Sequence, residues 1–284
     1  MKIIRLIKDL KAEIESLKLQ GKTIGFVPTM GALHDGHKAL VARSVAENDC
    51  CIVSIFVNPT QFNNVTDLNK YPRNLDNDAL LLQAVGCDII FAPESDEIYK
   101  AEELDNRFVY DFEGLDNVME GRFRPGHFNG VVQIVSKLFQ LVHPDKAYFG
   151  EKDFQQLAII HRMVEVLNYE IKIIDCPIVR EKSGLAMSSR NERLTAGQRK
   201  IAAEISKVLF ESRNFAAEMS PKELKKWVSD KINSISGLEV EYFEIVQVDN
   251  LQSFDNWTKP AVGCIAVFCG EVRLIDNIRY NINR

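Results

Sequence analysis

The chain has 284 residues, 46% hydrophobic and 26% charged, a composition that disfavours disordered, collagen-like and coiled-coil architectures and favours two unequal globular domains. Its 35 basic and 40 acidic side chains give a formal net charge of -5, so no overall basic field can hold DNA or RNA and we expect no nucleic-acid partner. No apolar run is long enough to span a bilayer, and the N-terminal segment is too charged for a signal-peptide core, so we expect a cytoplasmic protein without a membrane partner.

Apolar runs and helical patterns alternate through the first two-thirds of the chain. Residues 1–21 carry apolar side chains at helical spacing and end at Gly21, which predicts an amphipathic surface helix. Strands are predicted over residues 22–28, 50–58, 87–93, 146–150 and 170–177. Helices are predicted between them, from about His37 and over residues 76–85, 128–142 and 153–168. This repetition predicts an α/β fold, a Rossmann-like doubly wound parallel sheet with ligand sites at the carboxyl ends of its strands.

The order of elements changes beyond residue 180. Two consecutive helices are predicted over 196–219 and 221–234, followed by alternating segments at 239–248 and 264–276. This order predicts a smaller C-terminal α+β domain in which helices cover an antiparallel sheet. Pro177 interrupts the chain between the two patterns, so we place the domains at residues 1–177 and 178–284.

The six cysteines lie mostly in apolar runs, and none forms a CxxC pair. A zinc site built from cysteine and histidine is the alternative, but no pair has the spacing of a zinc finger or ribbon. We therefore expect buried, reduced thiols and no disulfide framework.

The segment VPTMGALHDGH, residues 27–37, connects a predicted strand to the first long helix. Gly31 lets the backbone approach a ligand, and the helix start offers unpaired N–H groups and the positive end of a dipole, which predicts a phosphate site. His34 and His37 are three residues apart, so both imidazoles reach the same polyphosphate as it gains charge. Two ordinary capping or surface histidines are the alternative interpretation.

Neither the GxGxxG nor the GxxxxGK[ST] motif occurs in this segment, so a nucleotide needs another binding device. The run His34-Asp35-Gly36-His37 matches the HxGH signature of a nucleotidyl-transfer superfamily that includes class I aminoacyl-tRNA synthetases. Four further segments narrow the match: FVNPTQF at 56–62, GRFRPGHFNGV at 121–131, FGEKDFQQL at 149–157 and GLAMSSRN at 184–191. In this order they resemble the pantoate–beta-alanine ligase (pantothenate synthetase) family over essentially the whole chain.

The resemblance implies a magnesium-dependent, homodimeric cytoplasmic enzyme that binds pantoate, beta-alanine and ATP. A carboxylate is a poor acyl donor, and attack on the α-phosphate of ATP gives it AMP as a leaving group. The family therefore forms a pantoyl-adenylate, releasing pyrophosphate, and then transfers the acyl group to beta-alanine. Negative charge builds on the phosphates, which requires hydrogen-bond donors and cations. The first domain is expected to bind ATP and pantoate, and the second to act as a lid.

Catalytic roles carried over from the family fall on His34, His37 and Lys152. Because the strand at 146–150 ends before Lys152, we expect this lysine in a strand-to-helix turn that faces the crevice. A solvated surface lysine is the alternative. The implied ATP-binding positions are Met30, Gly31, Ala32, Leu33, His34, Asp35, Gly36, His37, Gly150, Glu151, Lys152, Asp153, Val179, Met187, Ser188, Ser189 and Arg190.

The run Ser188–Arg190 resembles the family's counterpart of the synthetase KMSKS loop. It offers two hydroxyls and a guanidinium to a triphosphate, whereas a helix-capping loop is the ordinary interpretation. Its position at the domain junction suggests a lid that closes over ATP, with Gly184 as the pivot.

The resemblance also implies pantoate-binding positions at Gln61 and Gln156. Asn58 and Arg124 are further expected substrate-binding positions, and Arg124 is expected to approach the phosphates. Neutral amides suit a hydroxyl-rich substrate such as pantoate, because they donate and accept without the desolvation cost of a charge. A turn role is the alternative for Gln61. Val57 and Phe62 are expected to form an apolar wall for the gem-dimethyl group of pantoate.

Asp78 matches the carboxylate position of the family's motif and is the expected magnesium contact. Some members carry a second acid where this chain has Asn77, so the magnesium shell is expected to depend more on phosphate oxygens and water. Exposed acids at a helix start, Asp76 and Asp78, are the ordinary alternative. The remaining histidines, His127, His143 and His161, are expected to have structural roles.

Two other functions compete with ligation. A fragment of a class I aminoacyl-tRNA synthetase shares the HxGH chemistry, but it needs an RNA-binding domain and a basic face, which the C-terminal third lacks. A catalytically silent nucleotide-binding protein is the second alternative, and the presence of both histidines, Lys152 and the Ser188–Arg190 run argues against it. ATP consumption that depends on pantoate separates both from a ligase.

Overall fold

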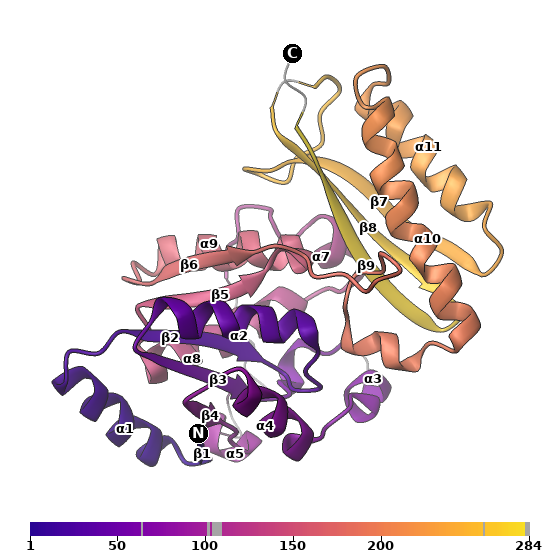
Figure 1. Ribbon diagram of the computed structural model, residues 1–284. Coiled ribbons are helices and arrows are strands. Elements are labelled where there is room, and N and C mark those ends of the chain that lie inside the picture. The colour runs from indigo at the N-terminus through magenta and orange to yellow at the C-terminus, as the bar shows by residue number, and fades with distance from the viewer. Residues whose placement is uncertain (64, 101–102, 104–109, 258, 282–284) are drawn as a thin grey trace. The chain divides into compact units, whose positions relative to one another are not determined.

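The computed structural model describes residues 1–63, 65–100, 103, 110–257 and 259–281 (Figure 1). The chain forms two compact units, each with its own hydrophobic core. The first unit comprises Met1–Asp116, Glu120–Glu151 and Gln156–Cys176, and the second comprises Asn117–Met119, Lys152–Gln155 and Pro177–Arg284. Among the described helices, none combines the length and the apolar character needed to cross a membrane.

The first unit is built on a six-stranded parallel sheet with the strand order β1-β4-β3-β2-β5-β6. Its strands are β1 (Lys2–Ile4), β2 (Ile24–Thr29), β3 (Cys50–Ile55), β4 (Ile89–Phe91), β5 (Lys146–Gly150) and β6 (Lys172–Cys176). Its α-helices are α1 (Ile7–Leu19), α2 (Asp35–Glu47), α3 (Val65–Lys70), α4 (Leu75–Ala84), α5 (Ser95–Ile98), α7 (Met119–Phe123), α8 (His127–Val142) and α9 (Phe154–Val166). Short 3-10 turns form at Pro59–Gln61 (η1) and Glu151–Asp153 (η2).

Both faces of this sheet are buried. Successive side chains of each strand point to opposite faces, and each set enters a hydrophobic core. Phe26 and Ile52 enter a core completed by α1, α8 and α9, whereas Val27 and Val53 enter a second core completed by α2 and α4. Strands covered on both faces carry apolar residues on both sides, which explains the continuous apolar run Cys50–Val53. The predicted doubly wound parallel sheet is confirmed.

The second unit contains a three-stranded antiparallel sheet in the order β7-β8-β9. Two helices, α10 and α11, lie against one face of this sheet and share its core (Figure 1). The prediction of a small α+β arrangement in the C-terminal part is therefore confirmed. The elements are η3 (Ser189–Arg193), α10 (Ala196–Ser212), η4 (Arg213–Phe215), α11 (Pro221–Asn233), β7 (Leu238–Gln247), β8 (Ala261–Cys269) and β9 (Val272–Tyr280).

Two predicted helices have different bounds in the structure. Lys2–Ile4 is a strand rather than the start of a helix, because its backbone pairs in parallel with β4 at the edge of the sheet. The helix predicted to reach residue 219 ends at Ser212, where the chain tightens into a 3-10 turn. Gly21 has a φ of 68°, the left-handed conformation expected just beyond the end of a helix.

Candidate active site

The β2–α2 turn, Met30–His34, lies at the topological switch point of the parallel sheet. Chain order runs from β2 to β3 and β4 on one side, whereas β5 and β6 lie on the other side of β2. The carboxyl ends of β2 and β5 are therefore adjacent, and open α/β sheets bind ligands at such a point. This topology supports the predicted location of the nucleotide site.

The backbone of the β2–α2 turn is held by polar side chains. Gly31 and Ala32 both have positive φ, 78° and 51°, and the second value is unusual for a residue with a Cβ atom. The Thr29 hydroxyl accepts a hydrogen bond from the Gly31 N–H at 3.2 Å. The Asp78 carboxylate accepts from the Ala32 N–H at 3.0 Å and from the Leu33 N–H at 2.8 Å. These bonds stabilise a strained turn that local sequence alone does not favour.

Each of the two histidines accepts a backbone hydrogen bond at the start of α2 through its Nδ1 atom. His34 Nδ1 accepts from the Gly36 N–H at 3.1 Å, and His37 Nδ1 accepts from the His34 N–H at 3.3 Å. An Nδ1 atom that accepts a backbone hydrogen bond carries no proton, so each neutral imidazole carries its proton on Nε2. The ring centroids are 4.1 Å apart. The turn therefore fixes two adjacent imidazoles in the tautomer that donates from Nε2.

Asp78 has a different environment from the one expected for a magnesium ligand. Its side chain is only 4% exposed, and both of its oxygens accept backbone N–H groups. Among the described residues, no group of three His, Cys, Asp or Glu side chains is arranged to hold a metal. Asp78 therefore orients the β2–α2 turn. Asp76, in the same turn of α4, is exposed.

Asn58 and Gln61 form a buried amide cluster after β3. The Asn58 Nδ2 group donates to the Gly130 carbonyl at 2.9 Å and to Gln61 Oε1 at 3.2 Å, and its Oδ1 accepts from the Tyr99 hydroxyl at 2.8 Å. Burial raises the pKa of Tyr99 to about 12, so this hydroxyl keeps its proton at neutral pH. Asn58 thus orients Gln61, whose Nε2 donates to Met30 Sδ at 3.0 Å.

The weak hydrogen bond from Gln61 to the Met30 sulfur leaves the Gln61 amide able to bind a better acceptor. A thioether is a weak acceptor, so a hydroxyl or carboxylate oxygen in its place would form a stronger hydrogen bond with Gln61. Gln156 is half-buried near the start of α9. The cluster therefore offers one oriented amide next to the β2–α2 turn.

The amide cluster is supported by Arg124, just after α7, and by His127, the first residue of α8. His127 Nδ1 lies 2.8 Å from the Gln61 carbonyl oxygen, which can only accept, so this ring atom carries the proton. His127 Nε2 then accepts from the Arg124 guanidinium at 3.2 Å, and Arg124 lies 3.6 Å from the Glu120 carboxylate. His127 therefore has the predicted structural role, and Arg124 contacts it in addition to any role in substrate binding.

Lys152 and the Ser188–Arg190 loop belong to the second unit. Lys152 follows the end of β5 by two residues, and its Nζ lies 3.5 Å from the neighbouring Asp153 carboxylate. Ser188 caps the following 3-10 turn by accepting from the Arg190 N–H at 3.3 Å, so the predicted capping role is present. Val179 accepts from the Met187 N–H at 3.0 Å and closes the base of the loop.

Several residues that hold the site were missed by sequence reasoning. Thr29 and Tyr99 bond directly to predicted site segments, and the backbone of Gly130 lies so close to Thr60 that an added Cβ atom would sit 2.5 Å from its carbonyl oxygen. Asp78 could have been recognised as buried, because it precedes the fully buried Leu82 by one helical turn. His161 Nε2 lies 2.8 Å from the Asp175 carboxylate at an exposed position, which fits a structural role.

Comparison with known proteins identifies the family. The family model described as pantoate-beta-alanine ligase matches residues 2–279. A pantothenate synthetase from Bacteroides fragilis is 59% identical over 282 residues, 99% of each chain. The solved enzyme of Thermus thermophilus superposes with a TM-score of 0.92 at 39% identity, covering 99% of this chain and 100% of that one.

A second solved relative carries ligands. The pantoate-beta-alanine ligase of Francisella tularensis, complexed with beta-gamma ATP and beta-alanine, superposes with a TM-score of 0.82 at 38% identity and covers 98% of this chain and 97% of its own. Sequence, fold and length agree along the whole chain, and the HxGH run lies at the switch point of the sheet where a nucleotide is expected. The chain therefore belongs to the pantoate–beta-alanine ligase family, the pantothenate synthetases.

Proposed function

We propose that the protein joins pantoate and beta-alanine in two steps at the β2–α2 turn. In the first step, a carboxylate oxygen of pantoate attacks the α-phosphorus of ATP, the bond from that phosphorus to the pyrophosphate oxygen breaks, and pantoyl-adenylate forms. In the second, the neutral amine of beta-alanine attacks the acyl carbon, the bond from that carbon to the phosphate oxygen of AMP breaks, and the nitrogen loses one proton to water as AMP leaves. The family assignment and the ATP- and beta-alanine-bound relative support this reaction.

His34 and His37 donate to the phosphates in the first step. Their Nδ1 atoms accept backbone N–H groups, so both rings donate from Nε2 while remaining neutral. The two rings, whose centroids are 4.1 Å apart, can donate to neighbouring oxygens as charge moves onto the leaving pyrophosphate. The start of α2 adds the positive end of its dipole.

Lys152 and the Ser188–Arg190 loop provide the remaining charge for the triphosphate. A lysine contributes a point charge and an arginine a planar fork, and both suit phosphate oxygens. We propose that residues 178–284 act as a lid over bound ATP, and that the predicted ATP-binding positions from Met30 to His37, Gly150 to Asp153, Val179, and Met187 to Arg190 line the nucleotide site.

Gln61 and Gln156 bind pantoate through their side-chain amides. Asn58 and Tyr99 fix the orientation of Gln61, so the amide presents its N–H group without first losing rotamer freedom. Val57 and Phe62 contact the gem-dimethyl group, and Gln61 also lies near the beta-alanine position. Arg124 supports this cluster through His127.

Magnesium enters this scheme as part of the nucleotide substrate. The Asp78 carboxylate is buried against backbone N–H groups, so we propose that phosphate oxygens and water supply the magnesium shell. The family resemblance also supports a homodimer and a cytoplasmic location. Light scattering coupled to size exclusion tests the dimer, with a mass near twice 32.3 kDa expected.

The observation that carries this proposal is the fixed tautomer of the two histidines. The test is exchange of labelled pyrophosphate into ATP, which requires pantoate but not beta-alanine if the adenylate forms first. Product analysis with both substrates should then find AMP and pantothenate in equal amounts. Exchange that occurs without pantoate, or that demands beta-alanine, contradicts the two-step scheme.

A further inference from the structure

Two adjacent polar residues are buried in the middle of β9. Asp276 and Asn277 are each 5% exposed, whereas the neighbouring buried positions Leu274, Ile278 and Tyr280 belong to the hydrophobic core of the second unit. Successive residues of a strand point to opposite faces, so the two polar side chains leave the strand in opposite directions. Buried polar groups are unfavourable unless they are hydrogen-bonded, so the partners of this pair indicate what it does.

Asp276 holds the base of the loop that leads to Ser188. Its two oxygens accept from the Arg180 guanidinium at 2.6 and 2.9 Å, in the paired geometry that gives arginine–carboxylate contacts their specificity. Arg180 also donates to the Gly184 carbonyl at 3.1 Å, and it pairs with Ala186 in an antiparallel bridge. Asp276 therefore fixes the hairpin from Arg180 to Ala186, two residues before Ser188.

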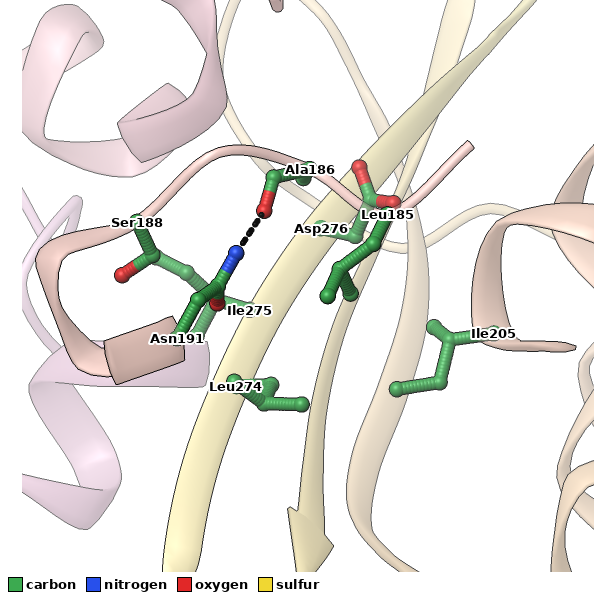
Figure 2. A pocket seen from close by; sticks show the side chains of 8 residues that line it. All are labelled: Leu185, Ala186, Ser188, Asn191, Ile205, Leu274, Ile275 and Asp276. Carbon is green, nitrogen blue, oxygen red and sulfur yellow. Dashed lines mark hydrogen bonds between the residues drawn. The ribbon is translucent and has the colours of Figure 1, made fainter. Parts of the chain in front are cut away.

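Asn191, at the far end of the same loop, hydrogen-bonds to the hairpin. Its Nδ2 group donates to the Ala186 carbonyl at 3.0 Å (Figure 2) and to the Glu181 carboxylate at 3.0 Å. Its Oδ1 has no hydrogen-bond partner among the described residues. Asn191 lines a cavity of about 10 Å³, which has room for roughly one water molecule. Ser188 and Asp276 line the same cavity (Figure 2). The Ser188–Arg190 run is thus anchored on both sides.

Asn277 holds Lys152 from the other face of the strand. Its Nδ2 group donates to the Lys152 carbonyl oxygen at 3.1 Å. Two more contacts fix the same segment: the Arg279 guanidinium lies 5.2 Å from the centre of the Phe154 ring, and the Gln155 amide donates to the Val118 carbonyl at 2.8 Å. The backbone at Lys152 is therefore bonded to β9 next to the residue that anchors the loop.

We propose that Asp276 and Asn277 are positioning residues for adenylate formation, because they hold Lys152 and the Ser188–Arg190 loop at a fixed spacing on the two faces of one strand. This inference rests on the proposed function, in which both groups contact one triphosphate. The reaction slows when the separation of two positively charged groups that contact the same phosphates changes. A misplacement of about 1 Å can lower its rate on the order of 10²-fold.

The test replaces Asn277 with leucine, which has a similar size and lacks the donor. Pantoate-dependent pyrophosphate exchange should lose kcat by on the order of 10- to 10²-fold, while the KM for ATP stays within about twofold, because Lys152 acts mainly on charge that develops in the transition state. If the leucine variant does not fold, Asn277→Ser serves instead, since its side chain is too short to replace the amide. It should show the same loss of kcat with a nearly unchanged KM for ATP. Asp276→Asn should also lower kcat.

Arg273→Gln on the same strand is the matched control. Arg273 pairs with Glu241 at 2.5 Å and takes no part in the contacts described above, so its loss destabilises the sheet without displacing Lys152. Exchange by Arg273→Gln should match that of the unmodified chain. An equal loss of kcat in this control, or unchanged kcat in Asn277→Leu and Asn277→Ser, overturns the positioning role alone. Absence of pantoate-dependent exchange in the unmodified chain overturns the proposed function and this inference together.

Discussion

Replacing Asp78 with asparagine separates a positioning role from a metal-binding role. The side chain is 4% exposed and accepts two backbone hydrogen bonds, from Ala32 and Leu33. Asparagine keeps one acceptor oxygen and turns an amide nitrogen toward the second N–H group. One buried donor without an acceptor costs about 1–3 kcal/mol, and the remaining bond loses about 1 kcal/mol of charge assistance.

The expected loss is therefore about 2–4 kcal/mol in the free energy of unfolding of the first unit, with relief of carboxylate desolvation favouring the lower end. In a unit of this size, that corresponds to a decrease in melting temperature of about 4–12 °C. Pantoate-dependent exchange should fall by at least about 10-fold, because the turn that carries His34 loses its support. Urea titration followed by circular dichroism and the exchange assay measure the two effects.

Asp76→Asn is the matched control, since it removes the same charge from an exposed position in the same turn of α4. Its effect on unfolding should stay within about 0.5 kcal/mol. If Asp78 instead bound magnesium, Asp78→Asn would raise the magnesium concentration needed for half-maximal exchange and leave the free energy of unfolding unchanged. That pair of results would refute the positioning role of Asp78.

Three other substitutions test separate parts of the structure. His37→Asn keeps an acceptor for the backbone N–H but removes the Nε2 donor, so exchange should fall by on the order of 10²-fold with an unchanged melting temperature. An exchange rate equal to that of the unmodified chain would contradict a role of this donor in the first step. Burial and nearby lysines lower the pKa of His143, so its contribution to stability is present above about pH 6.5 and is lost as the pH falls through that lowered pKa. His143→Gly should remove this loss in urea titrations at several pH values and add about 0.5–1 kcal/mol, since the residue has a φ of 44°; an unchanged pH slope would contradict this. Gly130→Ala places a Cβ atom 2.5 Å from the Thr60 carbonyl oxygen and should cost about 1–3 kcal/mol and raise the KM for pantoate, whereas Gly197→Ala, with its nearest atom at 4.0 Å, should be neutral in both assays.

Local patterns were sufficient to predict most of the first unit. The runs at 50–58 and 146–150 are mostly apolar because both sides of the sheet are covered, and the structure forms β3 and β5 there. The three-residue strand at Lys2–Ile4 was not predicted, because so short a segment shows no period of its own. Its conformation depends on pairing with β4, about 85 residues away.

Side-chain partners in the site were predicted less well than its segments. The sequence indicates that residues 27–37 form a strand-to-helix turn, but the support for that turn comes from Asp78, more than 40 residues later. Asn277 is 125 residues away from Lys152. Helical spacing puts Asp78 on the same face as Leu82, but nothing in the local pattern shows that its carboxylate accepts backbone N–H groups, since those contacts are created by the packing of distant elements.

The two interpretations of the histidine pair, capping and phosphate binding, are compatible because an imidazole has two nitrogens. Capping occupies Nδ1 of His34 and His37, and the proton that this leaves on Nε2 is the one a phosphate oxygen needs. An aspartate or serine cap would satisfy the same backbone N–H groups, but it offers no second, oriented donor on the opposite side of the side chain. A lysine would supply charge but could not accept the backbone bond that fixes its direction. Compared with these residues, histidine both closes the first turn of α2 and directs a neutral ring N–H away from it, so one side chain meets the folding requirement and the chemical requirement proposed for these two positions.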